Sequence, residues 1–269
     1  MTTPHDHSLG RVLDAVSVLS PARGEVARVR DGKAFVFAEG ADGRRVEVAT
    51  LVAGEAMVGC SPRQDGSRLL LVGVPNTHVD VVLLDDGLES AWLTRWISQL
   101  GKFLANGQWP TRAVDIRDVD GVVALGEQLA VSPRSGSSAS DPVVWVSIVS
   151  GSARVCGLRD ATLGPLDPPF PLARSTWLTG GNRCRPRVVA PPAQVGDWAS
   201  SLDLLGAAVL AAASERRVAK DRETIARLNP RRRSSREAAR ASVELLARAV
   251  EGDGSAWPRN GGPSAEHVA

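Results

Sequence analysis

The chain has 269 residues, of which 43% are hydrophobic and 23% are charged, and its net charge is +2. This length suits one large or two ordinary domains, and the hydrophobic share allows a packed core. Charges of both signs nearly cancel, which argues against a general nucleic-acid-binding protein and leaves only local basic effects. The longest apolar run, residues 202–213, is too short for a membrane span, and the polar N-terminus lacks the apolar core of a signal peptide. We therefore expect a cytoplasmic protein.

Short alternating strands with Gly, Pro and Asp turns follow the N-terminal segment. Apolar and polar residues alternate around the Asp-Gly dipeptides at 31–32 and 42–43, which predict two hairpin turns. A further strand pair is predicted at residues 67–75 and 77–85, whereas residues 9–19 indicate a short helix or an irregular lead-in. Many short strands with such turns favour a β-sandwich or barrel.

The apolar period changes to that of a helix over residues 87–105. Trp92 and Trp96 fall on the apolar face, where helical spacing indicates packing in the core more often than a ligand platform. Asn106 and Gly107 provide a plausible end for the helix. The sequence thus predicts one amphipathic helix after the first β region.

A second β region and a helical region complete the pattern. Residues 143–157 echo residues 24–40, each with a strand, a Gly-containing turn and another strand, which indicates two β-roll units in tandem. Helical spacing then runs to Leu228, is broken at 229–230, and resumes in a second helix over 234–250. The predicted organisation is a tail and lead-in (1–19), a first β-roll with its Trp-rich helix (20–108), a second β-roll (109–193), a helical pair (194–251) and a disordered tail (252–269).

The motifs of several enzyme classes are absent from the sequence. It contains no GxxxxGK[ST] phosphate loop, no HExxH and no GxSxG. His78 is the one histidine inside the predicted folded region, which argues against a histidine base or a multi-histidine metal site. Cys60, Cys156 and Cys184 lie far apart and are expected to be buried, reduced thiols. We expect a protein without enzymatic activity and without a cofactor.

One polar stretch suggests a ligand site. In a β-roll, a turn such as Gly54-Glu55, followed by Gly59, can present backbone N–H groups to a phosphate while the carboxylate binds a ribose hydroxyl. The phosphate also needs a cation, and Arg63 and Arg68 are near in sequence; Arg68 completes the tentative ligand set. Neither arginine has the small polar and Ala neighbours of a phosphate cassette, so a structural turn with a solvated Glu55 is the alternative.

A basic run near the C-terminus suggests a second surface. Arg231, Arg232, Arg233 and Arg236 follow the predicted helix break. They could contact a protein partner, an anionic membrane surface or nucleic acid. Aromatic residues for base stacking are missing, which argues against nucleic acid, and a solvated charged face is the simpler interpretation.

The order of these elements resembles the N-terminal cytoplasmic region of the NHLP-type bacteriocin export ABC transporters, a region that is itself similar to the cyclic-nucleotide-binding fold. The resemblance covers most of residues 20–250. It rests on the stretches GEVARV, LVAGEAMVG, LLLVGVPNT, WLTRWISQL, VVWV and FPLARSTWL. It implies a mainly β fold with α: two tandem jelly-roll units, cyclic-nucleotide-binding-like or cupin-like, joined by an amphipathic helix and followed by a C-terminal helical pair.

The resemblance also has implications for function, and the chain differs from the exporters in two respects. It implies a non-enzymatic accessory or regulatory module of a peptide-export or natural-product system that binds a peptide, a transporter or a biosynthetic protein, through which it would reach the membrane. An exposed apolar face on either C-terminal helix would favour a homodimer through these helices. Membrane helices and an ATPase are absent, so we expect a detached relative or a fragment. The alternatives are a cyclic-nucleotide-sensing regulatory protein, although "SRLLLVG" departs from the phosphate cassette, and a metal-dependent cupin enzyme.

Overall fold

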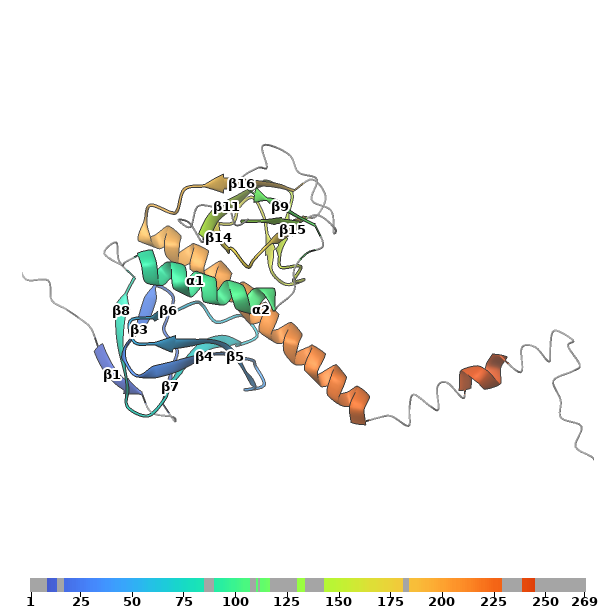
Figure 1. The fold of residues 1–269 in the computed structure, drawn as a ribbon, viewed down its shortest axis with the longest axis horizontal. Coiled ribbons are helices and arrows are strands. Elements are labelled where there is room, and N and C mark those ends of the chain that lie inside the picture. Colours follow the sequence, from blue (N-terminus) through green and yellow to red (C-terminus); the bar gives the residue numbers. More distant parts are fainter. Residues whose placement is uncertain are drawn as a thin grey trace, which may run out of the picture. The chain divides into compact units, whose positions relative to one another are not determined.

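The computed structural model describes residues 9–13, 17–84, 90–106, 110, 112–116, 130–133, 143–180, 184–228 and 239–244. Residues up to 217 belong to one compact unit, and residues from 218 onward belong to a second. Strands dominate the first unit, together with two helices (Figure 1). Among the described residues, none of the helices combines the length and the apolar character needed to cross a membrane.

The N-terminal β-roll consists of two four-stranded sheets. One has the order β1-β8-β3-β6 and the other β2-β7-β4-β5. Apolar residues alternate along the strands, so that Ala34, Val36 and Ala38 of β4 are all buried in a common core. The strands are β1 (Leu9–Leu13), β2 (Val18–Leu19), β3 (Glu25–Asp31), β4 (Lys33–Glu39), β5 (Arg45–Val52), β6 (Ala56–Val58), β7 (Arg68–Gly73) and β8 (Thr77–Leu83).

The hairpin predicted at 42–43 is confirmed, but the one at 31–32 is wrong. β4 pairs with β5 across the turn at 42–43. The turn at 31–32 connects β3 to β4, which lie in different sheets. A bulge at the end of β3 and Gly32, whose φ is +88°, direct the chain from one sheet to the other. The strands predicted at 67–75 and 77–85 likewise exist as β7 and β8, but they pair with other strands. Alternation predicts a strand correctly because each strand has one buried face, but it does not identify the sheet.

The predicted lead-in over residues 9–19 is also corrected. Residues Leu9–Leu13 form β1, which pairs antiparallel with β8, and Val18–Leu19 pair with β7 as β2. Leu13 is buried while Val12 is 61% exposed, which is the alternation of a strand. Five residues are too few to reveal their period, and the pairing partner lies far away in the sequence.

The C-terminal β-roll repeats the topology of the N-terminal one. Its sheets have the orders β14-β11-β16 and β13-β12-β15-β10-β9. Strands β11–β16 correspond one by one to β3–β8, and Gly151, with φ +75°, turns the chain between sheets as Gly32 does. The prediction of two tandem β-roll units is therefore confirmed. The strands are β9 (Ala113–Asp115), β10 (Ala130–Ser132), β11 (Val143–Ser150), β12 (Ala153–Val155), β13 (Thr162–Leu163), β14 (Phe170–Ala173), β15 (Leu178–Gly180) and β16 (Arg185–Val189).

Each β-roll is followed by a helix that packs closely against the other β-roll. Helix α1 (Ser90–Ala105) follows β8, and α2 (Val195–Leu228) follows β16. Gly101 and Gly206 occupy the same place in their helices, each preceded by Leu. A Cβ on Gly101 would lie 2.6 Å from the Cβ of Ala173 in the C-terminal roll. A Cβ on Gly206 would lie 2.7 Å from Cys60 in the N-terminal roll, so both contacts depend on glycine.

Helix α1 lies between the two β-rolls. It contacts β5 and β6 of the N-terminal roll and β11 and β14 of the C-terminal roll (Figure 1). Trp92 and Trp96 are both buried, which confirms their predicted role in packing. In the C-terminal roll, Trp145 packs edge-on against Trp198 of α2, with ring centroids 4.7 Å apart.

Helix α2 is helical as far as Leu228, and the break predicted at 229–230 lies outside the described residues and stays a prediction. Beyond the anchored part of this helix, Val218 and Ile225 are exposed. Residues 239–244 are helical, in agreement with the predicted second helix over that stretch. The remainder of the predicted second helix, the basic set Arg231, Arg232, Arg233 and Arg236, and the tail over 252–269 lie outside the described residues.

Candidate functional site

The Gly54-Glu55 turn joins β5 to β6, and Glu55 is engaged by the protein itself. Gly54 has φ +86°, a conformation that favours glycine. The Glu55 carboxylate accepts a hydrogen bond from the backbone N–H of Val52 at 3.0 Å through Oε2. Its Oε1 accepts a second bond from Nε2 of Gln99 on α1, at 3.4 Å. The carboxylate thus closes its own turn and ties it to α1.

Gly59 and Arg68 also have structural roles. The N–H of Gly59 donates to the carbonyl of Glu25 at 2.8 Å, and a Cβ here would lie 2.1 Å from the carbonyl oxygen of Ala22. Arg68 donates from Nη2 to Oε1 of Glu39 at 2.9 Å. Gly59 therefore permits a close backbone approach, and Arg68 is part of an ion pair.

These predicted ligand residues do not converge on one site. The Glu55 carboxylate accepts a hydrogen bond from the N–H of Val52, and Val52 pairs with Lys33 at the start of β4. Arg68 pairs with Glu39 at the other end of that strand. Six residues of extended chain separate the two ends by about 20 Å. A single mononucleotide could not be bound by the carboxylate of Glu55 and the guanidinium of Arg68 together.

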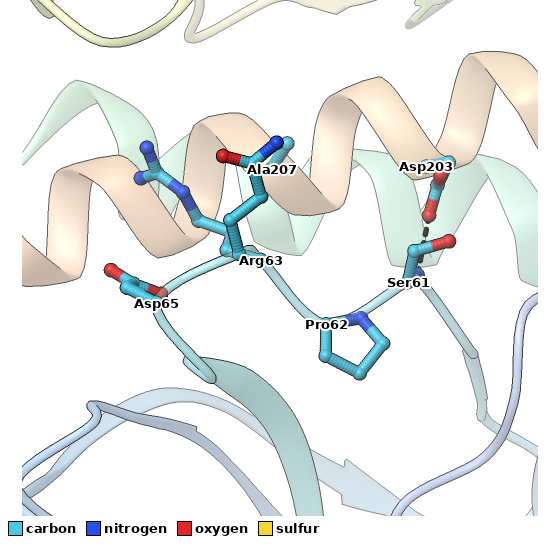
Figure 2. A pocket seen from close by; sticks show the side chains of 7 residues that line it. Ser61, Pro62, Arg63, Asp65, Asp203 and Ala207 are labelled. Atoms are coloured by element: carbon cyan, nitrogen blue, oxygen red, sulfur yellow. Dashed lines mark hydrogen bonds between the residues drawn. The ribbon is translucent and has the colours of Figure 1, made fainter.

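A cleft lies instead between α2 and the loop that connects β6 to β7 (Figure 2). Its volume is about 490 Å³, which is within the usual range of small-molecule sites. The backbone N–H of Ser61 donates to Oδ1 of Asp203 on α2 at 2.5 Å, so loop and helix are joined directly. Arg23 approaches the other oxygen of Asp203 at 4.0 Å. The lining includes Ser61, Pro62, Arg63, Asp65, Asp203 and Ala207.

Charges of both signs line this cleft. Asp65 accepts hydrogen bonds from the hydroxyl and the N–H of Ser67, at 2.6 and 2.9 Å, and these bonds lower its pKa. Arg63 is half-buried, and in Figure 2 its side chain extends from the loop toward α2. In the part of the chain that the structure describes, Arg63 has no carboxylate within 4 Å. Arg63 is the cation among the lining residues, and its charge also helps to lower the pKa of Asp65.

The sequence signals for this cleft were weak. The sequence offers Arg63 as a cation for a phosphate, but its neighbours do not fit the expected cassette. Asp203 is the one charged residue in the apolar run 202–213, and no motif marks it as part of a site. Because Ser61 and Asp203 are 142 residues apart, only the tertiary fold could bring them together.

The cysteines are free, as the sequence predicts. Cys60 and Cys184 are buried and Cys156 is half-buried. Burial raises the pKa of the Cys60 and Cys156 thiols to about 12, so neither is a thiolate near neutral pH. Among the residues that the structure describes, no group of three or more His, Cys, Asp or Glu side chains could hold a metal ion.

No family model matches the chain, and no curated protein matches it. Several solved structures do. Cyclic AMP-bound PfPKA-R is 10% identical, with 82% of this chain and 80% of that chain covered and a TM-score of 0.25. The regulatory domain of Toxoplasma gondii PKA with cAMP is 13% identical, with 78% and 85% covered and a TM-score of 0.25. The c-di-GMP responsive regulator CLP of Xanthomonas campestris is 17% identical, with 29% and 40% covered and a TM-score of 0.24.

This chain thus covers less than half of CLP, and it covers 47% of the Thermus thermophilus catabolite activator protein. The fold described above rests on the strand order of the chain itself, because similarity at these TM-scores carries no argument. CLP is named as a global regulator, the Toxoplasma gondii protein as a regulatory domain and the Thermus thermophilus protein as a catabolite activator, and none of the four is named as an exporter. The resemblance to bacteriocin exporters therefore has no support among them.

Proposed function

We propose that this protein is a regulatory module, without catalysis of its own, that binds a small anion of the cyclic-nucleotide class beside Arg63. The observation that carries the proposal is the direct bond between the cleft loop and α2, from the N–H of Ser61 to Asp203. A ligand that moves this loop would also move the helix. In this proposal the chain works in the cytoplasm, where free thiols such as Cys60 persist.

Two features of the cleft support an anionic ligand. Arg63 offers a guanidinium fork suited to phosphate oxygens. The apolar atoms of Pro62 and Ala207 provide a surface against which a base could pack. The site differs from the one predicted by sequence, because Glu55 and Arg68 are engaged elsewhere.

Ligand titration tests the proposal. Cyclic AMP, cyclic GMP and cyclic di-GMP are added in turn to the purified chain, and the melting temperature is followed. A ligand that binds only the folded state stabilises it, and at about 100 times Kd the melting temperature should rise by about 5–10 °C. We expect Arg63→Gln to abolish this rise.

The matched control is Arg68→Gln, which removes the arginine at the start of β7, outside the residues that line the cleft. It should preserve the ligand-induced rise in melting temperature. The proposal fails if none of the three nucleotides stabilises the chain in a saturable way. It also fails if the rise survives in Arg63→Gln.

A second candidate is a module of a peptide-export or biosynthetic system that binds a peptide or a transporter partner. The observation that favours it is the exposed stretch of α2, where Val218 and Ile225 are 46% and 59% exposed at heptad spacing. Arg231, Arg232, Arg233 and Arg236 stay a predicted partner or membrane surface. Binding of a synthetic leader peptide that Val218→Ser abolishes would support this candidate, and no binding at millimolar peptide would count against it.

A further inference from the structure

Three consecutive residues of α2 contact three separate parts of the first compact unit. They are Glu215, Arg216 and Arg217, which we call the 215–217 junction. An α-helix has 3.6 residues per turn, so successive side chains point about 100° apart. Three neighbouring side chains can therefore contact three different structural elements only where those elements pack around the helix on several sides. Arg217 is also the last residue of the compact unit.

Glu215 contacts the C-terminal β-roll. Its Oε1 accepts a hydrogen bond from the backbone N–H of Arg159 at 3.1 Å. Arg159 lies in the turn between β12 and β13, where the N–H of Leu158 donates to the carbonyl of Val155. The carboxylate thus holds a turn of the second β-roll onto α2.

Arg216 contacts the end of α1. It donates from Nη2 to the carbonyl of Phe103, and its guanidinium carbon lies 3.7 Å from the centre of the Phe103 ring. A cation is favourable at a helix C-terminus, and the Phe103 carbonyl also accepts a hydrogen bond from the N–H of Asn106 at 3.1 Å. Burial lowers the pKa of Arg216 from its high ordinary value. This side chain links the two helices directly.

Arg217 contacts the N-terminal β-roll. Its Nη1 donates to the carbonyls of Ala38 and Arg44, each at 3.4 Å, on the two sides of the β4–β5 hairpin. Gly40 makes room for it, since a Cβ on Gly40 would lie 2.7 Å from the Arg217 guanidinium carbon. Gly40 therefore leaves the space that this guanidinium occupies.

We propose that the 215–217 junction couples the two β-rolls, so that releasing α2 from one roll loosens its hold on the other. Side chains at positions i and i+2 of a helix do not face each other. Coupling between Glu215 and Arg217 would therefore pass through the helix backbone and through Arg216. Such a coupling is a free energy, and it must act equally in both directions.

Hydrogen exchange measured by mass spectrometry on the full chain tests this coupling. We expect Arg217→Gln to increase amide exchange about tenfold, the scale of one charged hydrogen bond, in the hairpin at 40–44. The increase should also appear at 156–161, in the other β-roll. Glu215→Gln should increase amide exchange in the same two segments. Gly40→Ala displaces the Arg217 guanidinium without removing any charge and should reproduce the pattern.

The matched control is Arg222→Gln, a change at an exposed arginine further along α2, which should leave both segments unchanged. The proposal is wrong if Arg217→Gln affects only 40–44, or if Glu215→Gln affects only 156–161. Faster exchange throughout, including β3 and β8, would also contradict it, because it would show general destabilisation. No nucleotide is present in this experiment, so its outcome is independent of the ligand proposed above.

Discussion

Glu39 shares its carboxylate between two arginines. Arg45 donates at 2.8 Å and Arg68 at 2.9 Å, and these interactions hold the pKa of Glu39 below its ordinary value of 4.5. Because the folded pKa is lowered, this contribution to stability is present above that value and is lost as the pH falls through the folded pKa. We predict that Arg45→Gln raises the pKa of Glu39 more than Arg68→Gln does, since the Arg45 bond is the larger cause. NMR titration of the side-chain carboxyl measures both shifts.

The control for Glu39 is Arg30→Gln. Arg30 pairs with Asp80 at 3.6 Å in the other sheet, so this variant should leave the Glu39 titration unchanged. A larger shift in Arg68→Gln would contradict the order of the two arginines.

At the scale of elements, the packing of α2 against Cys60 in the loop between β6 and β7 depends on Gly206. Alanine is the better helix former by about 1 kcal/mol, yet a Cβ here would lie 2.7 Å from Cys60. We predict that Gly206→Ala lowers the free energy of unfolding by about 1–3 kcal/mol, as overpacking does. Urea unfolding measures this change.

Gly196 of the same helix is the matched control, because a Cβ there would meet nothing within 4 Å. Gly196→Ala should raise the free energy of unfolding by about 0.4–1 kcal/mol through the entropy of the unfolded chain. Equal effects at the two glycines would show that the packing at Cys60 is loose.

The elements were more predictable than their partners. Periodicity located α1, α2 and most strands, because each has one buried face that repeats along the chain. It did not show that β3 and β4 belong to different sheets, since Asp31-Gly32 is compatible with a hairpin turn and with a connection from one sheet to the other. Sheet membership depends on contacts between residues far apart in the sequence, as for β1 and β8.

At the scale of the whole molecule, the same limit applies to the candidate site. Gly54 and Glu55 form the predicted turn, but the predicted partner Arg68 lies at the other end of β4. The cleft comes from a loop of the N-terminal roll and a helix that follows the C-terminal roll. A pattern within one segment cannot reveal a site that two distant segments build together.

Each β-roll is followed by a helix that packs against the other β-roll, and this arrangement predicts that both rolls unfold together. Trp96 of α1 is 2% exposed, and α1 contacts both rolls. We predict that Trp96→Ala lowers the free energy of unfolding by about 3–5 kcal/mol. Urea transitions followed by tryptophan fluorescence and by far-UV circular dichroism should coincide before and after the change, as two-state unfolding requires.

Arg95→Ala is the control for this prediction, because Arg95 is the exposed neighbour on the same helix. It should change the free energy of unfolding by less than about 0.5 kcal/mol. Two separate transitions in the unmodified chain would mean that the rolls are independent domains. A shift of only one transition in Trp96→Ala would show that α1 stabilises one roll alone, and the shared core inferred from its position would then be wrong.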